Sequence, residues 1–108
     1  MKESEVVNAI IKSVTITTAD HGVLSMWLHL DYGGTSQGFG GYCLYSPTHP
    51  DQDSGGWFIH KCMDIAGVST FEGMVGKIVR VKATHGGVTA IGHVVKDEWF
   101  NPGEEWKT

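Results

Sequence analysis

The 108-residue sequence is poor in cysteine, in proline and in charge, and each scarcity excludes a class of protein. Its two cysteines, Cys43 and Cys62, show neither C-x-x-C spacing nor a disulfide framework, which indicates a reducing compartment. No run approaches the roughly 20 apolar residues that cross a bilayer, and residues 1–10 lack the apolar core of a signal peptide. We therefore expect a cytoplasmic protein without a membrane partner.

Positive charge is especially scarce. Eight Lys and Arg residues face twelve Asp and Glu residues, which gives a net charge of −4. A protein that coats nucleic acid by charge alone needs a basic surface, so this composition argues against that mode of binding. With 41% hydrophobic and 19% charged residues, the chain has the composition of a globular domain, not of a disordered one.

Glycine is the abundant residue. The chain has fifteen glycines, nearly twice the average share of roughly 7%. Such a composition favours sharp turns and bent strands over long helices. The hydrophobic pattern agrees, because residues 23–32 alternate apolar and polar side chains as a half-buried strand does. In 6–18, Ala9, Ile10 and Ile11 break the same period, which indicates a bulge or a bend.

The order of the elements predicts a fold. The predicted strands cover 6–18, 23–32, 38–45, 76–84 and 86–95, and a helix covers 57–67. Its apolar stripe is Phe58, Cys62, Ile65 and Ala66, Asp53 or Ser54 can cap its start, and Gly67 stands at its C-cap. A strand–strand–strand–helix–strand–strand order is typical of the five-stranded OB barrel, although other small barrels and α+β sheets share it. We expect a mainly β (α+β) protein with a small five-stranded OB-like barrel over 1–96. Residues 97–108 form an acidic aromatic tail that packs on the barrel or extends from it.

The densest glycine run, DYGGTSQGFGGY at 31–42, is not a phosphate loop. Phe39 stands where a phosphate loop has lysine, and Cys43 stands where a dinucleotide fingerprint has its third glycine. Two interpretations remain open. Either the glycines curve a barrel strand, with Phe39 or Tyr42 packed over bare backbone, or rings such as Tyr32, Phe39 and Tyr42 form a platform on which a base stacks.

The few basic residues are grouped. Arg80 and Lys82 share the polar face of one predicted strand, and Trp27 and His29 share that of another. Together these side chains predict a small positive, aromatic groove for a nucleotide or a single strand of nucleic acid. In the tail, Trp106 is the ring most free to contact a partner. The predicted contact residues are therefore Trp27, His29, Tyr32, Phe39, Tyr42, Arg80, Lys82 and Trp106.

Catalytic and metal-binding patterns are weak. No serine or cysteine lies in a nucleophile elbow, and the paired carboxylates lie in the tail. His29, Asp31 and His60 are the best metal-ligand candidates, but they follow no recognised spacing. We expect a protein that is not an enzyme and that has no metal or cofactor. A metal-dependent hydrolase built on these three residues is the third-ranked alternative.

Three stretches carry a resemblance: LDYGGTSQGFGGYCLY, MDIAGVSTFEGMVGK and VRVKATHGGVTAIGHVVKDEWFNP. Together they resemble a family of small conserved phage and prophage proteins, and the resemblance extends over nearly the whole chain. It implies a phage-encoded accessory protein in the cytoplasm of the host cell, without implying catalytic residues. Such proteins act by binding single-stranded DNA, a replication or recombination protein, or a component of the host's antiviral defence.

The leading hypothesis is a non-enzymatic phage-type protein that binds a host or phage protein or a nucleotide-like ligand and blocks host defence. The second is a single-stranded nucleic-acid-binding protein of phage replication or recombination that uses the same residues. Exposed hairpin edges also allow a homodimer by strand pairing.

Overall fold

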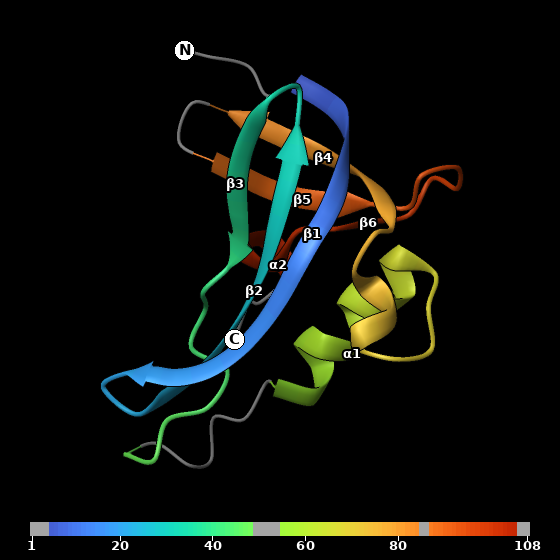
Figure 1. The fold of residues 1–108 in the computed structure, drawn as a ribbon. Helices are drawn as coiled ribbons and strands as arrows, with labels where there is room; N and C mark the ends of the chain where they lie inside the picture. Colours follow the sequence, from blue (N-terminus) through green and yellow to red (C-terminus); the bar gives the residue numbers. More distant parts are fainter. Residues whose placement is uncertain (1–4, 49–54, 85–86, 106–108) are drawn as a thin grey trace.

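The computed structural model describes residues 5–48, 55–84 and 87–105, and its strands form one antiparallel sheet in the order β3-β2-β1-β4-β5-β6 (Figure 1). The strands are β1 (Glu5–Asp20), β2 (Val23–Tyr32), β3 (Thr35–Gly40), β4 (Ile78–Thr84), β5 (Gly87–Gly92) and β6 (Trp99–Phe100). The helices are α1 (Gly55–Ala66), the short 3-10 helix η1 (Glu72–Met74) and α2 (Pro102–Glu105).

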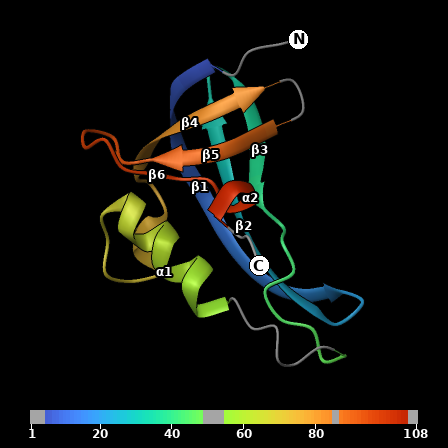
Figure 2. The same ribbon diagram turned by 180° about the vertical axis from the view of Figure 1, so that it is seen from behind.

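The long strand β1 makes the sheet curl. Its first half pairs with β4, so that Ala9 lies opposite Val79, and its second half pairs with β2, so that Val14 lies opposite Leu28. A bulge between Ile11 and Ser13 separates the two halves, where the sequence predicted a break in the period. Figures 1 and 2 show β1 crossing the whole sheet as one curved strand.

The protein is mainly β, as predicted, but its sheet is an open half-barrel of six strands where the sequence predicted a five-stranded OB-like barrel. The sixth strand comes from the predicted tail, where Phe100 pairs with Ile91 and Trp99 with Gly92 of β5. Among the described strands, no ladder joins β3 to β5, although the two strands approach each other. The short strand β6 occupies the outer edge of β5 only at Ile91 and Gly92.

The core lies on the concave side of the half-barrel. Met26, Leu28 and Leu30 of β2 are fully buried there, as their alternation predicted. Aromatic rings fill the open side of the half-barrel. The ring centroid of Phe58, on α1, lies 6.1 Å from that of Phe39 and 5.5 Å from that of Phe100. The helix therefore takes the place of side chains from a completed barrel.

Helix α1 follows its sequence signals. Phe58, Cys62 and Ile65 form its buried stripe, and Gly67 ends it with a φ of 74°. The N–H groups of Gly67 and Val68 both donate hydrogen bonds to the carbonyl of Met63 in the last turn, at 2.9 and 3.1 Å. The predicted capping residues at its start, Asp53 and Ser54, lie outside the described residues. No described helix is long and apolar enough to span a membrane.

The two thiols have opposite surroundings, which leads to a first prediction. Cys43 is exposed, whereas burial raises the pKa of the Cys62 thiol from 9.0 to about 12. A thiol reagent at pH 8 should therefore label one thiol in the native protein and two in denaturant, and Cys43→Ser should reduce these counts to none and one. Rapid native labelling of both thiols would contradict the buried position of Cys62.

The same pKa shift makes stability depend on pH. The folded protein keeps the proton of Cys62 while the unfolded chain loses it above pH 9, so this thiol destabilises the fold as pH rises from 9 towards 12.

Candidate functional site

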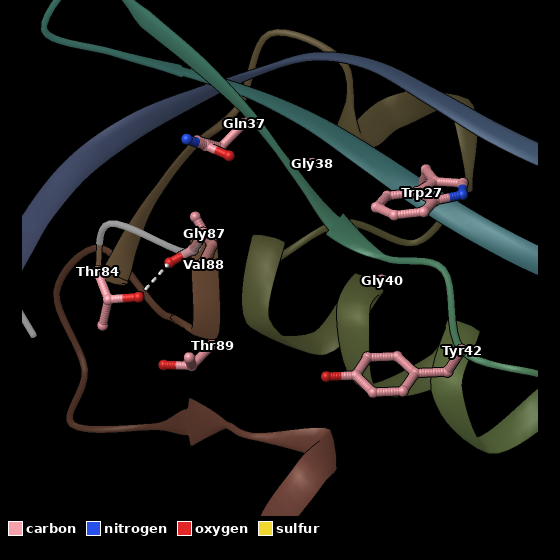
Figure 3. A pocket seen from close by; sticks show the side chains of 9 residues that line it. All are labelled: Trp27, Gln37, Gly38, Gly40, Tyr42, Thr84, Gly87, Val88 and Thr89. Atoms are coloured by element: carbon pink, nitrogen blue, oxygen red, sulfur yellow. Dashed lines mark hydrogen bonds between the residues drawn. The ribbon is translucent and has the colours of Figure 1, made fainter.

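An open groove of about 550 Å³ lies at the seam where β3 and β5 approach each other without pairing (Figure 3). β2 and β3 supply one wall, and the end of β4 with the start of β5 supplies the other. The lining residues are Trp27, Gln37, Gly38, Gly40, Tyr42, Thr84, Gly87, Val88 and Thr89. Two of them, Trp27 and Tyr42, belong to the predicted contact set.

Trp27 lies across bare backbone of the glycine run. A Cβ atom at Gly38 would come within 2.7 Å of Cε3 of the indole, and one at Gly41 would overlap the same ring. Only glycine leaves room for the ring at these positions. The glycines thus serve ring packing, as one interpretation held, but the ring is Trp27 rather than Phe39 or Tyr42. With 37% of its surface exposed, Trp27 is presented to the groove.

Tyr42 forms the second aromatic part of the groove. Its ring is half-buried, with its centroid 5.8 Å from that of Phe58, so the core holds the ring in place. Figure 3 shows the hydroxyl pointing across the groove towards the strand that carries Val88 and Thr89. Burial raises the pKa of Tyr42 above its ordinary value of 10.0, so the hydroxyl keeps its proton at neutral pH.

The opposite wall supplies hydroxyl and amide groups. Thr89 donates its hydroxyl proton to the carbonyl of Lys82, and Thr84 donates its own to the carbonyl of Gly87, both at 3.3 Å. From the first wall, Gln37 reaches towards Gly87, where an added Cβ would lie 3.8 Å from its Oε1 (Figure 3). The amide of Gln37 thus lies at the point where the two walls meet.

None of the nine lining residues carries a charge. The part of the lining that the structure describes therefore offers aromatic faces, hydroxyl groups, one amide and glycine backbone, without a cation to neutralise an anion or an acid–base pair. This chemistry suits a flat, uncharged, polar ring that stacks on Trp27 and forms hydrogen bonds at its edges.

Three other predicted residues lie outside the groove. Phe39 is 1% exposed and belongs to the core, so its ring has no free face for a ligand. Tyr32 is half-buried at the end of β2 and packs against the core. His29 is exposed on the same face of β2 as Trp27 and lies opposite Gly38, next to the groove rather than in it.

The predicted positive groove does not form. On β1, the partner of Arg80 is Asn8 and the partner of Trp27 is Thr15, so these two partners lie seven positions apart along the strand. Such a stretch spans roughly 20 Å of strand. The strand pattern gave the correct face for each side chain but not their distance along the sheet.

Arg80 and Lys82 instead hold a turn beside Trp99. Their cationic groups lie 4.9 and 4.7 Å from the centre of the Trp99 ring. Arg80 also donates hydrogen bonds to the carbonyls of His93 at 2.8 Å and Lys96 at 2.7 Å. Arg80 therefore fixes the connection between β5 and β6.

The remaining candidates are not brought together either. Trp106 lies outside the described residues. His29 and Asp31 lie on the outer face of β2, whereas His60 is exposed on α1 and pairs with Asp64 at 3.5 Å. Within 5–48, 55–84 and 87–105, no group of three His, Cys, Asp or Glu side chains is placed to hold a metal.

Sequence reasoning missed the second wall. Thr84, Val88 and Thr89 lie in and beside a predicted hairpin, but nothing in their local pattern indicates that this hairpin approaches β3. The glycine run was the signal that could be used, because the glycines at 38, 40 and 41 leave backbone without side chains, on which a ring can pack. Gln37 lies inside the run 31–42, but nothing in its local pattern indicates that its amide faces the groove.

Comparisons with protein-family models, with curated proteins and with solved structures found no match. What the chain binds is therefore inferred from the chemistry of the groove.

Proposed function

We propose that this chain is a small non-enzymatic binding protein that holds a nucleotide-like ligand in the groove between β3 and β5. The observation that carries the proposal is the placement of Trp27, whose ring rests on Gly38 and Gly41 and lines an uncharged groove. A ring supported in this way loses little conformational freedom when a base stacks on it, and such stacking contributes about 1–3 kcal/mol. Tyr42 and Gln37 supply polar groups for the edge of the base.

The arrangement of the strands supports an OB-like relationship. The order β3-β2-β1-β4-β5, with α1 between the third and fourth strands of the chain, is what an OB barrel would show if it were open between β3 and β5. OB barrels bind oligonucleotides or oligosaccharides on an open face. The groove at the seam lies beside β2 and β3, the strands that carry this face in the OB fold.

The resemblance to phage proteins adds to this proposal a hypothesis about where the protein is made and acts. A phage-encoded protein of this kind would act in the host cytoplasm by binding, and blocking a component of host antiviral defence is the role we favour. A protein partner remains the alternative ligand. The single-stranded nucleic-acid hypothesis loses one support, because Arg80 and Lys82 lie far from Trp27 along the sheet.

The test is a calorimetric titration of the purified protein with the four common ribonucleosides and their monophosphates, at low and moderate salt. We expect at least one to bind, and we expect Trp27→Ala to weaken binding by about 5- to 150-fold, the equivalent of about 1–3 kcal/mol of stacking. Trp27→Phe should retain most of the affinity.

Trp99→Phe is the matched control, because Trp99 lies on Gly92 as Trp27 lies on Gly38 but is not part of the groove. If none of the eight compounds binds, the proposal is wrong. If only short single-stranded oligonucleotides bind, with affinity that falls steeply as salt rises, the nucleic-acid alternative replaces it.

A further inference from the structure

The second half of β1 has an open edge on the side of β4. The β1–β4 ladder covers only Glu5–Ile10, and it ends where the N–H of Ile11 bonds to the carbonyl of Lys77. From there to the end of β1, β2 is the only described strand that pairs with it. Figures 1 and 2 show this end of β1 extending beyond β4.

Val14 and Ile16 direct their backbone N–H and C=O groups to this open edge. The carbonyl of Met26 in β2 bonds to the segment that follows β3, and the direction of the backbone groups alternates along a strand, so Trp27 directs its own groups to β1. Thr15, the partner of Trp27, therefore faces β2, and its two neighbours face away. Their outward groups have no hydrogen-bond partner in the part of the chain that the structure describes.

The side chains of this edge do not protect it from pairing. Edge strands that stay single usually carry a charged residue or a proline, or are covered. Residues 13–18 read SVTITT, with neither charge nor proline, and five of these six residues are β-branched, which favours strands. Ile16 is 42% exposed although its partner on β2, Met26, is fully buried. The outer edge of β3, by contrast, contains Gly38 and Gly40, and glycine weakens a strand.

A second copy of the same edge is a chemical complement. In an antiparallel pair centred on Thr15, Val14 of one copy lies opposite Ile16 of the other, and their outward backbone groups form about four hydrogen bonds. On the core side of the sheet, the two apolar side chains meet twice. On the outer side, Thr15 meets its own copy and Ser13 meets Thr17, so hydroxyl groups face hydroxyl groups. No charged side chain has to be buried for this pairing.

We infer that the chain forms a two-fold symmetric homodimer in which residues 13–17 of β1 pair antiparallel with the same residues of a second copy. This inference is independent of the proposed ligand. Pairing joins the two-stranded ends of both copies into a four-stranded sheet, β2-β1-β1-β2, whereas a two-stranded hairpin alone is marginally stable. Such an interface is small, so the dimer should exchange with monomer.

Sedimentation velocity from micromolar to near-millimolar protein tests this, and the mass should rise from one copy towards two. Thr15→Lys puts two like charges opposite each other at the symmetry axis, so it should weaken self-association by about tenfold or more. Thr15→Glu should do the same. An equimolar mixture of the two variants should associate again, because lysine then lies opposite glutamate. Thr15 is exposed, so both variants should keep the thermal unfolding midpoint of the dilute protein.

Ser36→Lys is the matched control, because it adds the same charge at an exposed position of β3, the other edge strand. It should leave the dimer intact. A protein that is monomeric at every concentration overturns the inference, and so does a dimer that Ser36→Lys weakens as much as Thr15→Lys does. A mixture of the lysine and glutamate variants that stays monomeric overturns the register centred on Thr15. None of these results changes what the nucleoside titration decides about the groove.

Discussion

Gly40→Ala should destabilise the protein by about 3 kcal/mol or more, which is a large fraction of the stability of a domain of this size. Gly40 has a φ of 120°, which an L-residue rarely adopts, and an added Cβ would collide with the carbonyl oxygen of Met26. That oxygen accepts the N–H of Gly41 at 2.8 Å, so it cannot move without opening the end of the β2–β3 ladder. Backbone strain accounts for about 1–3 kcal/mol and the collision adds to it.

Gly34→Ala provides the matched control. Gly34 lies in the turn before β3 with a φ of 79°, but a Cβ there would meet nothing within 4 Å. It should therefore cost only the strain of a left-handed residue, about 1–2 kcal/mol. Urea denaturation, with the slope against denaturant unchanged, measures both free energies of unfolding. Equal losses for the two variants would mean that the approach of Gly40 to Met26 does not constrain the fold.

Gly40→Ala also connects stability to the site. The contact that it breaks lies where β3 ends and beside the ring of Trp27, so any surviving folded protein should have a displaced Trp27. A red shift of tryptophan emission in the folded variant, absent from Gly34→Ala, would report that displacement.

Local patterns predicted what local physics decides. The alternation in β2 placed Met26, Leu28 and Leu30 in the core, and the spacing of Phe58, Cys62 and Ile65 identified the buried face of α1. Whether each of these side chains is buried depends on the hydrophobic periodicity of its own segment, and that periodicity can be read from the sequence. The bulge in β1 was visible for the same reason.

The features that could not be predicted from the sequence depend on pairing between strands that are distant in the chain. β6 has only two residues, too few to show a period, and it forms because Phe100 fills space beside Phe58 while Trp99 covers Gly92. The faces of Trp27 and Arg80 were predictable, but their separation depends on which part of β1 pairs with β2 and which part with β4. The groove requires β3 and β5 to meet, and that meeting depends on the curl of the whole sheet.

Phe58→Ala should have the largest effect of any single core substitution, with a loss of about 3–5 kcal/mol. Phe58 is fully buried and is the one ring that contacts Phe39, Tyr42 and Phe100 among the described aromatic pairs. Removing it leaves a cavity between α1 and the open side of the half-barrel, where no strand pairing compensates for the lost contacts. Thermal and urea unfolding measure the loss.

Phe58→Leu distinguishes the contribution of the aromatic ring contacts from that of the buried side-chain volume. Leucine restores most of the lost packing, so it should recover more than half of the stability, while the edge and face contacts between rings, worth about 0.5–1.5 kcal/mol for a pair, stay absent. Because Tyr42 rests on Phe58, the leucine variant should also bind the nucleotide-like ligand that we propose for the groove more weakly than the unmodified protein, even where it is fully folded. If Phe58→Ala unfolds at the same urea concentration as the unmodified protein, α1 is not what completes the core of the half-barrel.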